Sequence, residues 1–287
     1  MLAIYKKELR AYFTSLVGYV FIAFFLAIIG LYFYLYNISY GYANFEYVLS
    51  GVTFAFMVLV PIITMRVMAE ENRQKTDQLL LTAPVPTRAI IAGKYLALMS
   101  VYGIVMLVTC IYPLVLTKFG TVNLKIAYAS ILGYYLLGGA FMAIGLFIST
   151  CTENQLVAAV VTFIIVLITT LMEGIASLFP TDNKTAWLVF TFLLLVICLI
   201  TYAIMHNVVV SMGIAAIGEV ALTVIYIVKP TIYDGLIVKV FDWFSVITRF
   251  DHFIGGILDI SSIVYYISFS FVFLFLAVQC LNKRRWS

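Results

Sequence analysis

The chain is 287 residues long, and 64% of its residues are hydrophobic while only 10% are charged. Ordinary soluble domains carry about 25% charged residues, so this composition and a mean hydropathy of +1.12 exclude a soluble globular protein and indicate an integral membrane protein. The net charge of +4 is too small to indicate a nucleic-acid partner.

Residues 1–14 predict an amphipathic helix, because apolar side chains recur at helical spacing and basic side chains fill the other side: Lys6, Lys7 and Arg10. Such a helix is expected to lie under the inner leaflet as an interfacial elbow. A signal peptide is the competing interpretation. The apolar run that follows is too long for one and lacks a small-residue cleavage site.

The expected fold class is all-α: a polytopic membrane helix bundle. A bilayer core needs about 20 apolar residues per helix, and eight segments qualify: about 17–36, 48–68, 94–116, 127–150, 155–176, 187–205, 208–229 and 261–282. Pro61 predicts a kink near the inner end of the second helix, serving either gating or static packing. Glycines at 133, 138, 139 and 145 predict that the fourth helix lies centrally in the bundle or at a dimer seam.

The segment from Glu70 to Lys94 is a long polar interruption with seven charged residues. Thr76 is a suitable N-cap for a short helix carrying three leucines, which Pro84 and Pro86 would end, and Thr87 is a suitable N-cap for the helix that follows. The pattern predicts a short helix at the membrane face, a rigid proline turn and a return into the membrane. That helix could lie on lipid headgroups or bind a partner protein.

The residues of this segment favour the partner. The pattern Glu71-x-Arg73-x-Lys75-Thr76-x-Gln78-Leu79-Leu80-x-x-Ala83-Pro84-Val85, followed by Gly93-Lys94, resembles the first cytoplasmic loop of type-2 ABC exporter permeases. Gln78 replaces the usual acidic residue, which is a common variant of that pattern. The turn after Ser149 resembles the second cytoplasmic loop, which follows a Gly-rich helix ending G-L-x-x-S. The C-terminal pattern around Gly256, Asp259 and Arg284-Arg285-Trp286 resembles the GldF-like subfamily.

This resemblance implies that residues 70–93 form a coupling loop that docks on a separate ATPase subunit. The implied coupling residues are Glu70, Glu71, Arg73, Lys75, Thr76, Gln78, Leu79, Leu80, Pro84 and Lys94. It also implies two ATPase subunits per complex, which bind ATP and Mg²⁺, and a second permease chain that is identical or related. This chain itself is expected to bind no cofactor and no metal, because its four cysteines lack C-x-x-C spacing and it has only two histidines.

Residues 185–229 have no counterpart in that resemblance and are interpreted as a helical pair inserted into a six-helix exporter core. The charge-free run from Thr185 to Gly218 would be about 51 Å long as one helix, too long for one crossing. We divide this run at His206-Asn207 into two helices. The pair either spans the membrane twice or is re-entrant. Glu219 is a candidate pathway residue, because a charge within a membrane helix is costly and is therefore expected to serve a function. The alternatives are that its carboxyl group is protonated or that the helical pair is tilted so that Glu219 meets water.

Residues 231–259 alternate apolar and charged positions at helical spacing and predict one or two short helices at the outer leaflet, acting as a lid or as an anchor. With the N-terminus inside and eight crossings, inner segments hold 11 of the 17 basic residues and outer segments hold six. This asymmetry predicts cytoplasmic N- and C-termini and a multi-pass protein of the cell membrane.

No G-x-x-x-x-G-K-[ST] phosphate loop occurs in the sequence, so the chain is not expected to hydrolyse ATP. The sequence predicts the permease subunit of an ABC transporter that exports an amphipathic, lipid-like or peptide cargo. The alternatives are a non-transporting scaffold or sensor coupled to an ATPase, a proton-coupled carrier, and a membrane enzyme acting on lipids through Asp251, His252 and Asp259.

Overall fold

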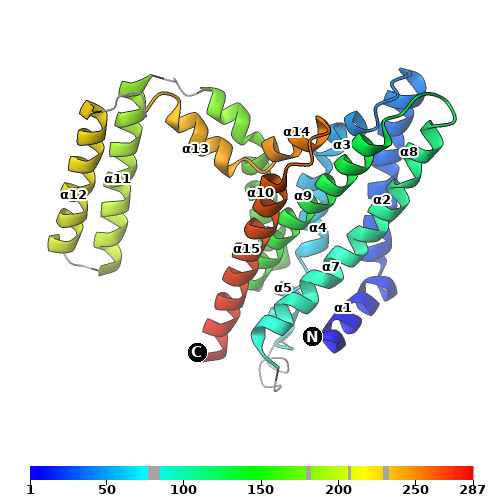
Figure 1. Ribbon diagram of the computed structural model, residues 1–287. Helices are drawn as coiled ribbons and strands as arrows, with labels where there is room; N and C mark the ends of the chain where they lie inside the picture. The colour runs from blue at the N-terminus through cyan, green and yellow to red at the C-terminus, as the bar shows by residue number, and fades with distance from the viewer. Residues whose placement is uncertain (77–84, 179–181, 206–207, 229–232, 287) are drawn as a thin grey trace. The chain divides into compact units, whose positions relative to one another are not determined.

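The computed structural model describes residues 1–76, 85–178, 182–205, 208–228 and 233–286. All regular secondary structure in these ranges is helical, which confirms the predicted all-α class (Figure 1). The helices are α1 (Leu2–Thr14), α2 (Leu16–Phe33), the π-helix η1 (Tyr34–Ser39), α3 (Glu46–Val52), α4 (Ala55–Thr64), α5 (Ala69–Gln74), α7 (Thr87–Thr109), α8 (Ile111–Leu116), α9 (Leu124–Cys151), α10 (Gln155–Leu178), α11 (Asn183–Met205), α12 (Val208–Val228), α13 (Leu236–Phe244), α14 (Thr248–Ile254) and α15 (Ile260–Trp286).

The chain forms two compact units, one of residues 1–170 and 246–287 (unit 1) and one of residues 171–245 (unit 2). Within the described residues, five helices are long and apolar enough to cross a membrane: Leu16–Ser39, Thr87–Leu116, Leu124–Cys151, Gln155–Leu178 and Ile260–Arg285. A bent pair, Glu46–Val52 with Ala55–Gln74, would be a sixth. The seventh and eighth crossings, assigned to residues 187–229, stay a prediction.

Helix α9 is the centre of unit 1, as its glycines predicted. In its most apolar window 78% of the residues are buried, against 44% or less in the other candidate spans. It contacts α4, α7, α14 and α15. A Cβ added at Gly138 would lie 2.5 Å from the ring of Tyr102, and one at Gly145 would overlap the Thr64 hydroxyl. These glycines therefore let neighbouring helices approach α9 closely.

The second predicted membrane helix bends at a different place from the one expected. The bend of 63° lies at Thr53-Phe54, between α3 and α4, whereas Pro61 lies inside α4. At the bend the Thr53 hydroxyl donates to the Leu49 carbonyl at 3.0 Å, and the N–H of Phe56 bonds three residues back to Thr53 at 3.2 Å. Hydrogen bonds of this i+3 type tighten the chain and end the regular helix, whereas the kink expected at Pro61 stays a prediction.

Unit 2 contains the two helices predicted at residues 187–205 and 208–229, which pack against each other as α11 and α12 (Figure 1). Tyr233 closes a small core of this unit. Its hydroxyl donates to the Leu222 carbonyl at 2.9 Å, and its ring lies 5.9 Å from that of Tyr226. The predicted outer amphipathic segment contains α13, in unit 2, and α14, in unit 1.

Candidate functional site

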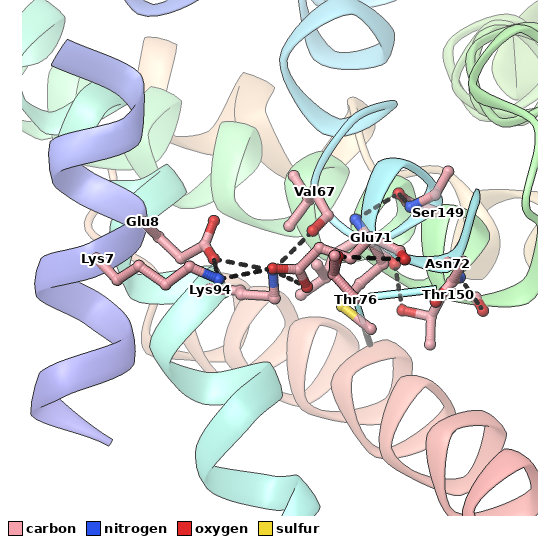
Figure 2. A network of polar contacts seen from close by, with 12 residues as sticks. Lys7, Glu8, Val67, Glu71, Asn72, Thr76, Lys94, Ser149 and Thr150 are labelled. Carbon is pink, nitrogen blue, oxygen red and sulfur yellow. Dashed lines mark hydrogen bonds and ion pairs between the residues drawn. The ribbon is translucent and has the colours of Figure 1, made fainter. Parts of the chain in front are cut away.

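Four charged side chains gather where α1, α5 and α7 meet in unit 1: Lys7, Glu8, Glu71 and Lys94 (Figure 2). We call them the charge cluster. Figure 1 shows both chain termini at this end of unit 1. Two acids and two bases balance one another, so the cluster carries no net charge.

Lys94 is the buried centre of the charge cluster, since its side chain is 0% exposed. Its Nζ donates to Oε1 of Glu8 at 3.0 Å and to the carbonyl of Val67 at 2.8 Å. It also lies 2.8 Å from Oε2 of Glu71, an ion pair whose angle does not suit a hydrogen bond. A buried ammonium is tolerated when it is paired and hydrogen-bonded in this way.

Lys7 completes the cluster from the solvent side. Its Nζ donates to Oε1 of Glu71 at 2.9 Å and lies 3.8 Å from Glu8. Partial burial lowers the pKa of Lys7, but the hydrogen bond to Glu71 and the charges of Glu71 and Glu8 outweigh burial, so the pKa is raised overall. Lys7 therefore stays charged, and Glu71 joins the two lysines.

Gly93 explains how α1 comes close enough to α7 for these contacts. A Cβ added at Gly93 would lie 3.2 Å from the Met1 carbonyl and 3.2 Å from the Ile4 side chain. The hydroxyls of Tyr5 and Ser100 share a hydrogen bond of 3.0 Å farther along the same contact. The neighbouring Gly93 and Lys94 thus have separate roles, because the glycine admits α1 and the lysine pairs with it.

Helix α5 is held from its other side by the end of α9. Oγ of Ser149 accepts hydrogen bonds from the N–H groups of Met68 and Ala69, at 3.0 and 3.1 Å. Nδ2 of Asn72 donates to the Thr152 carbonyl at 3.1 Å. Ser149 satisfies N–H groups that the start of a helix leaves without partners, so it caps α5 from a different helix (Figure 2).

The C-terminal end of α5 is a Schellman motif. Lys75 adopts the left-handed conformation with φ of 57°, and its N–H bonds to the Asn72 carbonyl at 3.3 Å. The N–H of Thr76 bonds to the Glu71 carbonyl at 3.0 Å. This pairing reverses the chain sharply after α5. The predicted helix after Thr76, with Gln78, Leu79, Leu80 and Pro84, lies outside the described residues.

The remaining predicted residues divide between interior and surface. Glu70 accepts two hydrogen bonds from Arg66, at 2.8 and 3.0 Å, four residues before it in the chain. Arg73 and Lys75 are exposed on α5, and Lys6 and Arg10 are exposed on α1. The predicted coupling residues therefore separate into Glu71 and Lys94, which are held inside the chain, and Arg73 and Lys75, which face outward.

Sequence reasoning missed Glu8, Asn72 and the capping role of Ser149. Glu8 looked like one more polar residue of α1, although the residue is only 9% exposed and its carboxylate bonds to Lys94, 86 residues away. Thr87 was predicted to cap α7. The N-cap is Pro86 instead, and the hydroxyl of Thr87, the first residue of the helix, donates to Oδ1 of Asn282 on α15 at 2.7 Å. Among the described side chains, no group of three His, Cys, Asp or Glu could hold a metal ion.

A comparison with protein families decides the class of protein. Residues 2–188, more than half of the chain, match the model of the ABC-2 family transporter protein. The chain belongs to the ABC-2 transporter family. No curated protein is similar enough to it to count as a match.

Membership makes this ABC-2 permease a membrane transport component and a partner of an ABC ATPase, rather than the ATPase itself. It is a multi-pass membrane protein. The matched range contains the whole charge cluster and Ser149. It ends at residue 188, shortly after the start of the helical pair that sequence analysis set apart.

Proposed function

We propose that this ABC-2 permease is the membrane subunit of a GldF-like exporter, in which the charge cluster transmits movement from an ATPase to the membrane helices. Two ATPase subunits bind ATP and Mg²⁺, and a second permease chain, identical or related, completes the pathway. Residues 1–287 act as one transmembrane domain with 185–229 inserted. The cargo is amphipathic, lipid-like or peptide in nature, which suits a chain with 23 Phe and 20 Tyr.

The orientation proposed is that the charge cluster and both termini face the cytoplasm. The support is the excess of basic residues, 11 against six, in the segments assigned to that side. This orientation gives residues 70–93 access to an ATPase. The elbow residues Lys6 and Arg10, exposed on α1, would then meet the headgroups of the inner leaflet.

The observation that carries the proposal is the pairing of buried Lys94 with Glu8 and Glu71. It ties α5, which forms the first part of the coupling loop, to the elbow helix and to α7. Ser149 and Asn72 tie α5 to α9 as well. A displacement of the loop by closing ATPase subunits cannot move α5 alone. It must move α1, α7 and α9 with it or break a buried ion pair, which is costly.

The proposal gives the coupling residues two separate roles. Exposed Arg73 and Lys75, together with the predicted loop helix, contact the ATPase. Glu71 and Lys94 act inside the chain as positioning residues that keep α5 joined to its neighbours. An experiment can separate the two roles. The first affects the affinity between permease and ATPase, and the second affects the coupling of ATP hydrolysis to transport.

The test is to purify the permease with its ATPase and to measure both affinity and cargo-stimulated ATP hydrolysis. Arg73→Glu should weaken association at least about tenfold, because reversing an interface charge places like charges together. Glu71→Gln should leave association nearly unchanged while lowering the coupling between hydrolysis and transport. Arg285→Glu, at another exposed base in the last turn of α15, is the matched control and should change neither.

Normal affinity and normal coupling in both Arg73→Glu and Glu71→Gln would refute the coupling mechanism. Hydrolysis without any transported cargo would favour the scaffold or sensor alternative over an exporter.

A further inference from the structure

A groove between α7 and α15 runs from the end of the bundle that carries the chain termini toward its middle. Two hollows form it, of about 440 and 260 Å³. The first is lined by Thr87, Arg88, Gln279 and Asn282 among apolar side chains, and the second by apolar side chains with Tyr95 and Ser270. Phe271 and Leu274 line both hollows, so the two lie next to each other.

The groove has the length of one leaflet. From Thr87 to Met99 it follows about 18 Å of α7, and from Asn282 to Ile267 about 22 Å of α15, at 1.5 Å per residue. Half of a bilayer's hydrocarbon core is about 15 Å. A lipid with its headgroup at Asn282 would therefore lay an acyl chain along the groove as far as the bilayer midplane.

The mouth of the groove is basic and has hydrogen-bond donors. Arg88 is exposed there and makes no ion pair with any residue that the structure describes. Oδ1 of Asn282 accepts the Thr87 hydroxyl, which leaves Nδ2 as a donor. Neither hollow has an Asp or Glu among the described residues that line it.

This mouth contrasts with three paired basic groups of the same end. Lys7 and Lys94 are neutralised by Glu8 and Glu71, and Arg66 is neutralised by Glu70. Arg88 differs in bordering an apolar groove that has no Asp or Glu among its described lining residues. An arginine offers a planar set of N–H donors that suits a phosphate group.

We infer that the groove between α7 and α15 binds one anionic phospholipid, with its phosphate at Arg88, Gln279 and Asn282 and one acyl chain against Phe271 and Leu274. The inference rests on the proposed function only for naming the leaflet, which is the inner one if the termini are cytoplasmic. Any groove open to lipid fills with acyl chains, so the specific claim is selection of an anionic headgroup at this position.

The experiment is native mass spectrometry of the full-length chain in detergent, titrated with phosphatidylglycerol or phosphatidylcholine of the same acyl chains. The wild type should retain phosphatidylglycerol several-fold better. Arg88→Gln should lower that preference about fivefold, the effect expected of one base near an anionic surface. Lys125→Gln, which removes an exposed base in the first turn of α9 that lines neither hollow, is the matched control and should keep the preference.

A second pair of variants tests the groove itself. Ala92→Phe fills the first hollow, while Leu96→Phe adds bulk to an exposed position one turn away that lines neither hollow. Ala92→Phe should release phosphatidylglycerol and Leu96→Phe should not, with thermal unfolding confirming that both variants fold. Inorganic phosphate should not compete, because it has no chain to place in the groove.

Equal retention of the two lipids, equal losses in Arg88→Gln and Lys125→Gln, or full competition by inorganic phosphate would overturn the inference. So would an Ala92→Phe variant that separates paired permease chains while keeping its lipid, since the groove would then be a subunit interface. These measurements need no ATPase, so their failure leaves the permease proposal unaffected.

Discussion

Lys94 in unit 1 and Glu219 in unit 2 are both charged residues of apolar helices, but their surroundings differ. Lys94 is fully buried and held by two hydrogen bonds and an ion pair that come from α1, α5 and the turn before α5. Glu219 is half-buried, and its carboxylate accepts a hydrogen bond of 3.4 Å from Thr191 of α11. The comparison shows two ways to offset the cost of an ionisable side chain in an apolar helix. Lys94 is held by contacts with several elements of unit 1, whereas Glu219 is partly exposed.

The largest expected effect comes from removing the charge of Lys94. Lys94→Met should destabilise the protein by about 3–5 kcal/mol, because it leaves Glu8 and Glu71 without their buried partner. The measurement is unfolding of the purified chain in detergent. Lys6→Met, at an exposed position of α1, should stay within about 0.5 kcal/mol.

A double variant makes this prediction sharper. Lys94→Met combined with Glu8→Gln should recover part of the lost stability, because the carboxylate that lost its partner is removed too. If Lys94→Met alone were as stable as Lys6→Met, the cluster would not hold α1, α5 and α7 together.

A second expected difference concerns glycines of the two units. Gly145→Ala in α9 should cost about 1–3 kcal/mol, because its Cβ would overlap the Thr64 side chain of α4. Gly213→Ala in α12 should instead be neutral or gain up to about 1 kcal/mol, because no atom lies within 4 Å of the added Cβ and alanine favours helix. Unfolding of the two variants under the same conditions measures the contrast, and equal effects would contradict the assignment of α9 as the packed centre of unit 1.

The smallest expected effect on stability is that of Glu219→Gln. The amide keeps an oxygen that can accept the hydrogen bond from Thr191, so unfolding should change by less than about 1 kcal/mol. Transport by the reconstituted complex is the informative measurement. A loss of transport in a stable variant would support Glu219 as a pathway residue, whereas unchanged transport would remove it from the pathway.

Much of the fold could be predicted because a lipid environment restricts which backbone structures can span it. Membrane helices must satisfy their own backbone groups, so long apolar runs identify them, and the glycines of α9 mark where another helix comes close. The sequence also contained the pair Gly93-Lys94, but only the structure shows that Gly93 admits α1 and that Lys94 bonds to Glu8.

The missed features depend on contacts between distant parts of the chain. Thr87 has the right local position for a cap, yet its hydroxyl bonds to Asn282, 195 residues away. Pro61 has the right local chemistry for a kink, yet the chain bends at Thr53, where the neighbouring Gly51 admits the ring of Tyr32. The local sequence limits which caps, bends and hydrogen bonds a residue can form. Packing against other helices determines which of them is present in the folded chain.

The position of Lys94 also has a consequence for how the protein is made. A ribosome adds about 5–20 residues per second, so the lysine emerges roughly 4–17 s after Glu8, to which it bonds across 86 residues of sequence. During that interval the first helix has no ammonium partner from α7, and its carboxylate must stay in contact with water. The elbow helix can therefore reach its final position only after the start of the third hydrophobic segment has been synthesised, about a third of the way along the chain.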